Sequence, residues 1–246
     1  MRSTLLQQRE DSPRDRQPTL AVHWERINWF RWPGHTFESQ RGIRASMTEP
    51  FWEKSYKDDN VSTFGVHPNP TIAEKWPIFA SNGAVLEVGC GEGKNAIFLA
   101  QKGFAVDAFD ISVAGIAKLK RLASKHHIEL NAWAQDLREF GFDKEYDVVT
   151  SHGTLHFVAR QDWKDFILRA KEHTRSNGIH IMQIFTNKVP AAPDIAPLAI
   201  GLANEGELFD LYRDWRILET KAYVFEDEHP GVDKHFHASN KIVAIR

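Results

Sequence analysis

Three glycines stand at alternate positions, Gly89, Gly91 and Gly93, directly after an apolar run in the stretch VLEVGCGEGKN at residues 85–95. Glycine costs backbone entropy and adds no packing, so the cluster indicates that the backbone must be bare here. Bare backbone after a strand lets a ligand approach the carboxyl end of that strand. Asp110 ends the next apolar run, where a carboxylate can accept hydrogen bonds from both hydroxyls of a ribose. The pattern predicts a ligand with a ribose; a tight strand-to-helix turn without a ligand is the alternative.

The spacing of the glycines separates two classes of such ligands. Dinucleotide enzymes use G-x-G-x-x-G, whereas Lys94 follows the third glycine here and the spacing is G-x-G-x-G. The sequence also lacks a Tyr-x-x-x-Lys catalytic pair. Both features disfavour a nicotinamide-dependent oxidoreductase, which remains the alternative enzyme class.

The elements that position these residues alternate between strand and helix. We expect strands at 84–88, 104–110, 128–136, 146–151 and 178–186, with helices at 94–102, 112–125 and 161–174 between them. This alternation predicts an α/β fold with a mostly parallel sheet and helices on both faces. The segments 215–227 and 234–246 follow each other with only a short turn between them, which predicts a closing antiparallel hairpin.

The motifs carry a family resemblance. VLEVGCGEGKN together with VDAFDIS resembles the class I S-adenosylmethionine (SAM)-dependent methyltransferases, and NEGELFDLYRDWRILE narrows the resemblance to the tellurite-resistance (TehB-like) family. The resemblance covers residues 47–246. It implies a Rossmann-like, doubly wound, seven-stranded sheet that is mostly parallel with an antiparallel last strand. It also implies a SAM-dependent methyltransferase that acts on a small-molecule heteroatom nucleophile, such as a thiol or a chalcogen oxyanion.

The resemblance assigns the adenosine half of the cofactor site. The three glycines would pass under the cofactor, Asp110 would hold the ribose hydroxyls, and Ile111 would pack on the adenine. Asp136 would accept a hydrogen bond from the adenine amino group, and Leu137 would supply a backbone donor. A cap of the helix that follows is the alternative role for Asp136.

The methionine half of the cofactor is assigned in the same way. Glu87 would lie near the methionine ammonium or support the loop, and Asn95 would open the helix beside the loop. Ser151, at the end of the fourth strand, would lie beside the methionine moiety; an ordinary strand end is its alternative. Trp52 and Tyr56, in the aromatic stretch FWEKSY, would flank the sulfonium, because aromatic faces attract cations; packing of an N-terminal helix is the alternative.

Methyl transfer itself requires mainly orientation and a dry site, so the acceptor side offers no universal motif. The apolar, proline-interrupted segment at 189–203 resembles a lid over a small or hydrophobic acceptor. His229, His235 and His237 gather near the end of the chain and are candidates for a base or an anion-orienting group. His235 and His237 would point the same way on a strand, but no carboxylate or cysteine constellation near them in sequence completes a metal site, so we expect no metal.

The family uses a histidine–arginine group in this tail for its oxyanion substrate. His229 aligns best with that histidine, and Pro230 stands where the family has arginine. This departure argues against tellurite or selenite as the acceptor. His152 and His156 follow the fourth strand and are further candidates on this side.

Composition bounds the remaining possibilities. The formal net charge is -2, and the one cysteine, Cys90, excludes both an internal disulfide and a multi-cysteine zinc site. We find no basic stripe and no Asn/Asp-Pro-Pro-Tyr motif, which disfavours a nucleic acid substrate. No apolar run reaches the roughly 18 residues of a membrane span. A cytoplasmic protein without membrane or nucleic acid partners is therefore expected.

Residues 1–46 differ from the rest, because they contain eight arginines and no lysine. The stretch QREDSPRDRQP predicts disorder. We expect a dispensable extension or a partner-binding arm before the methyltransferase domain at 47–246; an organellar transit peptide is the weaker interpretation. A protein that binds SAM without turnover is the alternative from another functional class.

Overall fold

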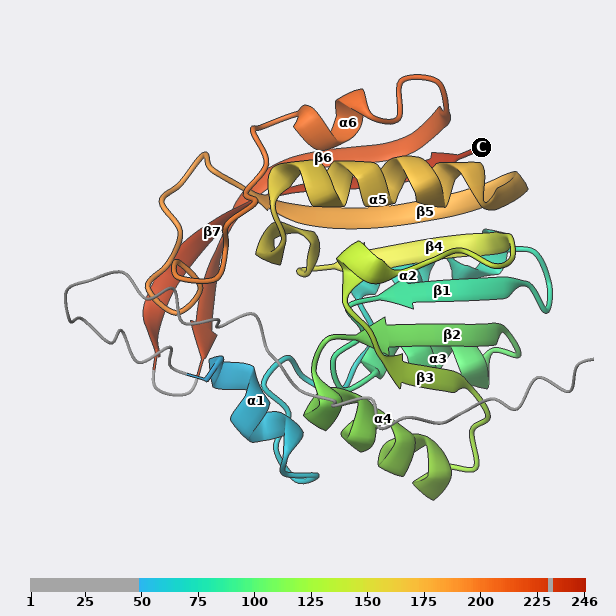
Figure 1. Cartoon of the computed structure of the whole chain (residues 1–246), viewed down its shortest axis with the longest axis horizontal. Helices are drawn as coiled ribbons and strands as arrows, with labels where there is room; N and C mark the ends of the chain where they lie inside the picture. Colours follow the sequence, from blue (N-terminus) through green and yellow to red (C-terminus); the bar gives the residue numbers. More distant parts are fainter. Residues whose placement is uncertain (1–48, 230–231) are drawn as a thin grey trace, which may run out of the picture. The chain divides into compact units, whose positions relative to one another are not determined.

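The computed structural model describes residues 49–229 and 232–246, without the side chains of His229 and Val232 (Figure 1). The predicted extension at 1–46 lies outside these residues, so its disorder stays a prediction. Within the described residues, one mixed sheet with helices on both faces holds the predicted sites.

Seven strands form the sheet in the order β3-β2-β1-β4-β5-β7-β6. Their bounds are β1 Ala84–Val88, β2 Ala105–Asp110, β3 Asn131–Ala134, β4 Tyr146–His152, β5 Thr174–Thr186, β6 Arg216–His229 and β7 Val232–Ile245. The first five strands pair in parallel, and β7 runs antiparallel between β5 and β6. The predicted α/β fold with a closing antiparallel hairpin is confirmed.

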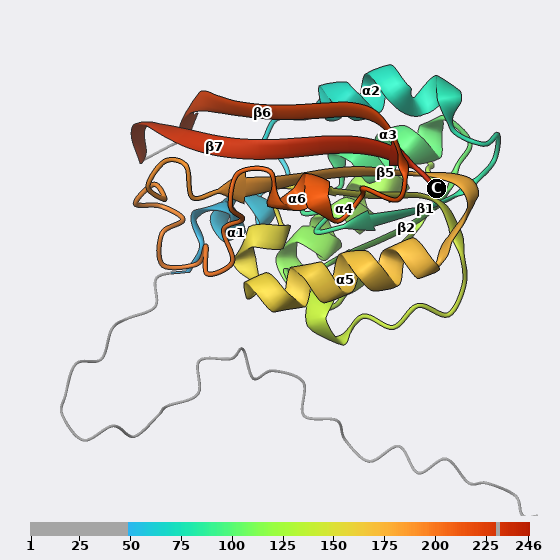
Figure 2. The ribbon, with the colours of Figure 1, turned by 90° about the horizontal axis from the view of Figure 1, so that it is seen from above.

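Helices cover the sheet on both faces (Figure 2). The α-helices are α1 Phe51–Tyr56, α2 Pro70–Lys75, α3 Lys94–Gln101, α4 Val113–Lys125, α5 Arg160–Glu172 and α6 Glu207–Asp210, and the 3-10 helices are η1 Trp76–Ile78, η2 Leu137–Glu139 and η3 Leu155–Phe157. Buried side chains of α2, α3 and α4 pack on one face, and those of α5 and α6 pack on the other. Because helices cover both faces of the sheet, side chains on both sides of the central strands are buried, and the sequences of these strands are largely apolar.

Alternation along the strands divides the core into two clusters. Val85 of β1 and Val148 of β4 join the cluster under α3 and α4, whereas the next residues, Leu86 and Val149, join the cluster under α5. Successive side chains of a strand point to opposite faces, so neighbouring residues supply different cores. Because β1, β2 and β4 pair in parallel, their carboxyl ends lie at one edge of the sheet, where the glycine loop follows β1.

Two strands, β3 and β5, differ most in length from the prediction. β3 is shorter than the predicted 128–136, because the chain turns into η2 after Ala134 and Asp136 caps that turn. β5 begins at Thr174, before the predicted 178, because Thr174 already pairs with Tyr146 across a register shift. None of the helices in the described part of the protein has the length and apolar character needed to cross a membrane.

Candidate cofactor and acceptor site

The glycine loop joins β1 to α3 with its backbone in the left-handed region. The φ angles of Gly89, Gly91 and Gly93 are 69°, 54° and 88°, which residues with a Cβ atom rarely adopt. The N–H groups of Gly89 and Cys90 donate to the carbonyl oxygen of Phe109 over 2.8 and 3.0 Å. The glycines therefore permit a tight path that is fastened to the end of β2.

Protein side chains occupy the space beside each glycine of the loop. A Cβ atom at Gly89 would lie 2.0 Å from the hydroxyl oxygen of Thr154. A Cβ atom at Gly91 would lie 2.5 Å from the hydroxyl oxygen of Tyr56, and one at the third glycine would lie 2.1 Å from a methyl carbon of Leu119. The backbone conformation and these contacts within the protein both require glycine here. The sequence predicted only the close approach of a ligand as the reason.

Asp110 lies at the end of β2 with both carboxylate oxygens turned toward the glycine loop and α4. One oxygen accepts from the N–H of Gly91 and the other from the N–H of Ser112, each over 2.8 Å. Burial raises the pKa of Asp110, while these two N–H donors act in the opposite direction. Each oxygen keeps lone-pair capacity, so the oriented carboxylate can accept two further hydrogen bonds from a diol.

Glu87 and Ser151 place buried polar atoms beside the loop. Glu87 Oε1 accepts from Asn95 Nδ2 over 2.7 Å, and Asn95 Oδ1 accepts from the N–H of Asn69 over 2.7 Å. The other oxygen of Glu87 and the hydroxyl of Ser151 have no hydrogen-bond partner among the residues that the structure describes. Ser151 pairs with Val88 at the end of β1. Because buried polar groups are normally hydrogen-bonded, these two atoms indicate a polar ligand.

Burial raises the pKa of Glu87 to about 7, which predicts a pH-dependent affinity for a ligand with an ammonium group. Since the pKa lies above that of an exposed glutamate, this group's stabilisation of the fold is present at low pH and lost as pH rises through about 7. An ammonium that pairs with Glu87 needs the carboxylate, so SAM should bind more tightly as pH rises from about 5.5 to 7.5, by at most about tenfold per unit.

Calorimetric titration with SAM at several pH values in this range checks the dependence on Glu87. Glu87→Gln should bind SAM more weakly at pH 7.5 and flatten the slope, while Glu74→Gln, an exposed control on α2, should keep it. The pKa of Asp110 is also raised, so Asp110 contributes to the pH dependence as well. The part of the slope that Glu87→Gln removes is therefore the contribution of Glu87. Equal slopes for wild type and Glu87→Gln would contradict a role for Glu87 in ammonium binding.

The side chains assigned to the adenine lie at the ends of β2 and β3. Ile111 is 45% exposed beside Asp110, as a surface for an aromatic ring would be. Asp136 caps η2 by accepting from the N–H of Arg138 over 2.8 Å, and it also pairs with the Arg138 guanidinium. Burial opposes ionisation of Asp136, but the bonds from Arg138 outweigh it and hold the pKa below its usual range. The capping role is thus present, and adenine binding by Asp136 and the N–H of Leu137 stays a prediction.

The aromatic stretch forms α1, which packs against α4 and the glycine loop. Tyr56 is buried, with its hydroxyl against Gly91 and its ring against Gly115 of α4. Trp52 contacts the ring of Phe157 in η3, with 5.1 Å between the ring centroids. Both side chains therefore pack within the protein beside the site, and contact with a sulfonium stays a prediction.

Two lysines tie the segment around α1 to the glycine loop and α4. Lys118 Nζ lies 2.5 Å from the Glu92 carboxylate and donates to the carbonyl oxygen of Ser55 over 3.0 Å. Lys94 donates to the carbonyl oxygen of Phe64 over 2.6 Å. These contacts hold the glycine loop, and no local sequence pattern predicts them.

Histidine and phenylalanine rings form a wall next to the end of β4. Phe185 at the end of β5 stacks on His156 at 4.3 Å and on His237 of β7 at 4.5 Å. Burial lowers the pKa of His156 to about 3, so this ring is neutral near pH 7. The wall joins η3, which contacts Trp52, to the closing hairpin, and so connects the predicted cofactor side to the tail histidines.

The side chains of His235 and His237 contact each other, and a carboxylate lies beside them. The Nε2 atoms of His235 and His237 are 3.0 Å apart, and Asp194 Oδ2 lies 3.7 Å from His235 Nε2. Asp194 belongs to the predicted apolar lid, so the structure supplies the nearby carboxylate that the sequence did not reveal. The side chain of His229 lies outside the described residues, and its role stays a prediction.

Comparison with known proteins identifies the family. A family model described as tellurite resistance protein TehB matches residues 52–233. The chain belongs to the TehB family. This assignment places it among the class I SAM-dependent methyltransferases, as the glycine motif predicts.

Relatives with sequence similarity extend this assignment. The chain is 28% identical over 169 residues to a protein of Haemophilus influenzae named probable S-adenosyl-L-methionine-dependent methyltransferase TehB, and the match covers 68% of this chain and 57% of the relative. It is 35% identical over 98 residues to a ubiquinone biosynthesis O-methyltransferase of Rickettsia typhi, covering 40% of this chain and 39% of that protein. The chain spans about half the length of the curated TehB relatives that it matches.

The crystal structure of TehB from Haemophilus influenzae has the same fold. It superposes with a TM-score of 0.65 at 24% identity, covering 72% of this chain and 62% of the TehB chain. The likeness supports the doubly wound sheet described above.

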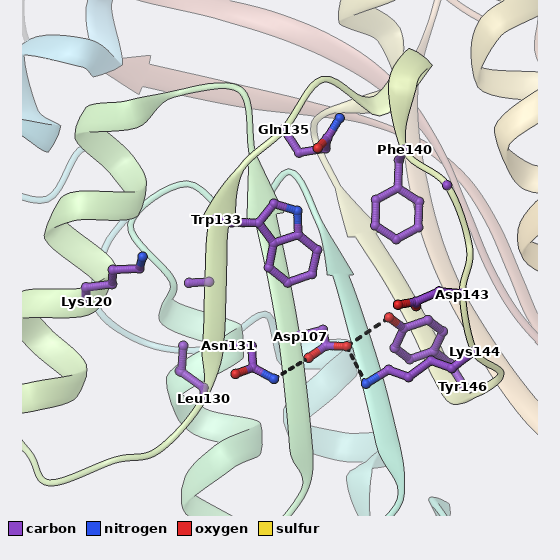
Figure 3. Close-up of a pocket in the computed structure, with 12 residues that line it drawn as sticks. Asp107, Lys120, Leu130, Asn131, Trp133, Gln135, Phe140, Asp143, Lys144 and Tyr146 are labelled. Carbon is purple, nitrogen blue, oxygen red and sulfur yellow. Dashed lines mark hydrogen bonds and ion pairs between the residues drawn. The ribbon is translucent and has the colours of Figure 1, made fainter. Parts of the chain in front are cut away.

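The candidate cofactor site at the glycine loop is distinct from a surface pocket along the edge strand β3 (Figure 3). This pocket has a volume of about 670 Å³ and is lined by residues that include Trp133, Gln135 and Lys144. It contains neither the glycine loop nor Asp110. Asp107 within it accepts from Tyr146 and pairs with Lys144, so its polar groups bind one another.

Proposed function

We propose that this TehB-family protein binds SAM at the carboxyl edge of β1, β2 and β4 and transfers its methyl group to a heteroatom of a small molecule. The observation that carries the proposal is the Asp110 carboxylate, oriented by two N–H donors beside a left-handed glycine loop. Its remaining lone pairs suit the two hydroxyls of a ribose.

Buried groups beside the loop match the amino acid part of SAM. The second oxygen of Glu87 would accept from the ammonium, and the Ser151 hydroxyl would bond the same moiety. The positive ligand would balance a carboxylate whose ionisation burial opposes. An anionic pyrophosphate would face the Glu87 carboxylate instead, which disfavours the dinucleotide alternative.

SAM held by Asp110, Glu87 and Ser151 would supply a methyl group on a sulfonium, an electrophile for a heteroatom of the acceptor. The protein contributes orientation and exclusion of water. Trp52 with Phe157, and Phe185 stacked on His156, are proposed to supply the apolar surfaces that exclude water between the loop and the tail histidines.

On the acceptor side, His235 and His237 are proposed to take a proton from the acceptor or to orient an anion. His152 and His156 are less suited to bind an anion, because burial lowers the pKa of each to about 3 and keeps them neutral. We propose a thiol, a chalcogen oxyanion or a similar nucleophile as the acceptor class. The Rickettsia relative is named as an O-methyltransferase, so small phenols belong in the same test.

Turnover with a panel of acceptors tests this function. The protein with SAM and a small thiol, selenite, tellurite or a small phenol should form S-adenosylhomocysteine with one of these classes, measured by mass spectrometry. His235→Gln should lower turnover by about 100-fold or more, as expected for loss of a base, with unchanged SAM affinity. His67→Gln, an exposed histidine elsewhere, should behave as wild type. SAM binding without product from any acceptor would favour a protein that binds SAM without turnover.

A further inference from the structure

Three potential metal ligands converge from two separate segments of the protein. Asp194 comes from the 189–203 segment, and His235 and His237 lie on β7. One ligand atom of each lies within 4.8 Å of the others. Their side chains are nearly buried, at 2%, 9% and 4% exposed for Asp194, His235 and His237. Two imidazoles and a carboxylate in one buried place form a donor set that binds zinc and related ions.

The spacing of the two imidazoles suits a shared ion. Their Nε2 atoms are 3.0 Å apart. Zinc–nitrogen bonds are about 2.0–2.1 Å long, so two cis ligands of one ion lie roughly 3.0–3.4 Å apart. Small adjustments of the Asp194 carboxylate would bring its oxygen, now 3.7 Å from His235 Nε2, into the same coordination sphere.

The second ring nitrogen of His235 fixes the form of this ring. Nδ1 lies 2.7 Å from the backbone carbonyl oxygen of Asp233, and a carbonyl only accepts, so Nδ1 carries a proton. In the neutral ring Nε2 then bears a lone pair, and this atom faces His237. Histidines that bind metals commonly donate their other N–H to a backbone carbonyl in this way.

The surroundings add negative charge and an apolar wall. Asp227 Oδ2 lies 3.9 Å from His237 Nε2, and Phe185 stacks on the His237 ring. Carboxylates beside two imidazoles in a buried place favour a cation between them. A protonated histidine would be attracted to these carboxylates in the same way, and metal titration distinguishes it from a bound ion.

We propose that Asp194, His235 and His237 bind one divalent transition-metal ion of the zinc type. Nitrogen ligands disfavour Mg²⁺ and Ca²⁺, which prefer oxygen. Three protein ligands leave a position open for water or another ligand. The ion would join the 189–203 segment to β7. A second role rests on the proposed function. The ion would take the place of the histidine base proposed above, because an acceptor bound to a metal loses its proton more easily.

Metal titration of the full-length protein tests the site without SAM. The protein is prepared without a histidine tag, stripped with a chelator and titrated with Zn²⁺ by calorimetry, and Co²⁺ absorption reports the ligand geometry. Wild type should bind one equivalent of Zn²⁺. Asp194→Asn and His235→Gln should each weaken binding by more than about 100-fold, beyond the usual effect of outer-shell changes. His67→Gln should bind as wild type.

The near-isosteric Asp194→Asn keeps the test valid if a histidine variant fails to fold, and near-UV circular dichroism checks folding in each case. Absence of stoichiometric Zn²⁺ binding would overturn the proposal, as would equal binding by wild type and folded Asp194→Asn. Because the titration contains no SAM, a failure to bind Zn²⁺ would say nothing about SAM binding or turnover, which are measured separately.

Discussion

Lys118→Met should lower the free energy of unfolding by about 3–5 kcal/mol, as is usual when one partner of a buried ion pair is removed. The side chains of Lys118 and Glu92 are 2% and 6% exposed, with 2.5 Å between their charged atoms. Lys118 also donates to the backbone carbonyls of Ser55 and Val61. Methionine would fill the space but leave the Glu92 charge and both carbonyls without this donor.

Chemical denaturation followed by circular dichroism measures this loss. Lys120→Met is the matched control, because Lys120 is exposed on the same helix, and it should change the free energy of unfolding by less than about 0.5 kcal/mol. Combining Lys118→Met with Glu92→Met should recover much of the stability, since an apolar pair avoids the buried charge. A single Lys118→Met no less stable than the control would show that the pair does not hold α1 to the loop.

Asp110→Asn should weaken SAM binding by at least about 100-fold. Hydrogen bonds to a charged group contribute about 1.5–3 kcal/mol each, and the proposed site places two ribose hydroxyls on this carboxylate. Asparagine keeps one acceptor oxygen, so its amide nitrogen would face an N–H of Gly91 or Ser112 instead of accepting from it. Both the ligand bonds and the orientation of the loop are affected.

Asp107→Asn is the control for Asp110→Asn. Asp107 lies on the same strand, but it bonds Asn131 and Tyr146 away from the loop. Its replacement should alter stability and leave the dissociation constant for SAM within about twofold of wild type. If the two variants bound SAM equally well, Asp110 would not hold the cofactor.

Local sequence signals predicted the fold and the elements that carry the candidate cofactor site. Glycine spacing, strand ends and helical periodicity act within a few residues, so β1, α3 and the position of Asp110 followed from them. The same reasoning overextended β3, because Asp136 turns the backbone by capping, a local competitor of strand pairing.

Contacts between distant segments were beyond the sequence. Lys118 occupies a position on α4 that only a folded partner, Glu92, makes suitable for burial. Asp194 lies far from the histidines in sequence, and the path of the 189–203 segment brings it beside them. The role of Thr154 against Gly89 likewise depends on how the β4–α5 connection crosses the loop. No spacing rule encodes these encounters, because tertiary packing sets them.

Calorimetry of the wild-type protein with SAM, S-adenosylhomocysteine and NADH tests whether the protein binds SAM in preference to a dinucleotide. We expect one equivalent of each sulfur ligand to bind with a micromolar dissociation constant, on the order of -8 kcal/mol, and NADH not to bind. Absence of binding by both sulfur ligands, or NADH binding in their place, would contradict the account and favour the oxidoreductase alternative.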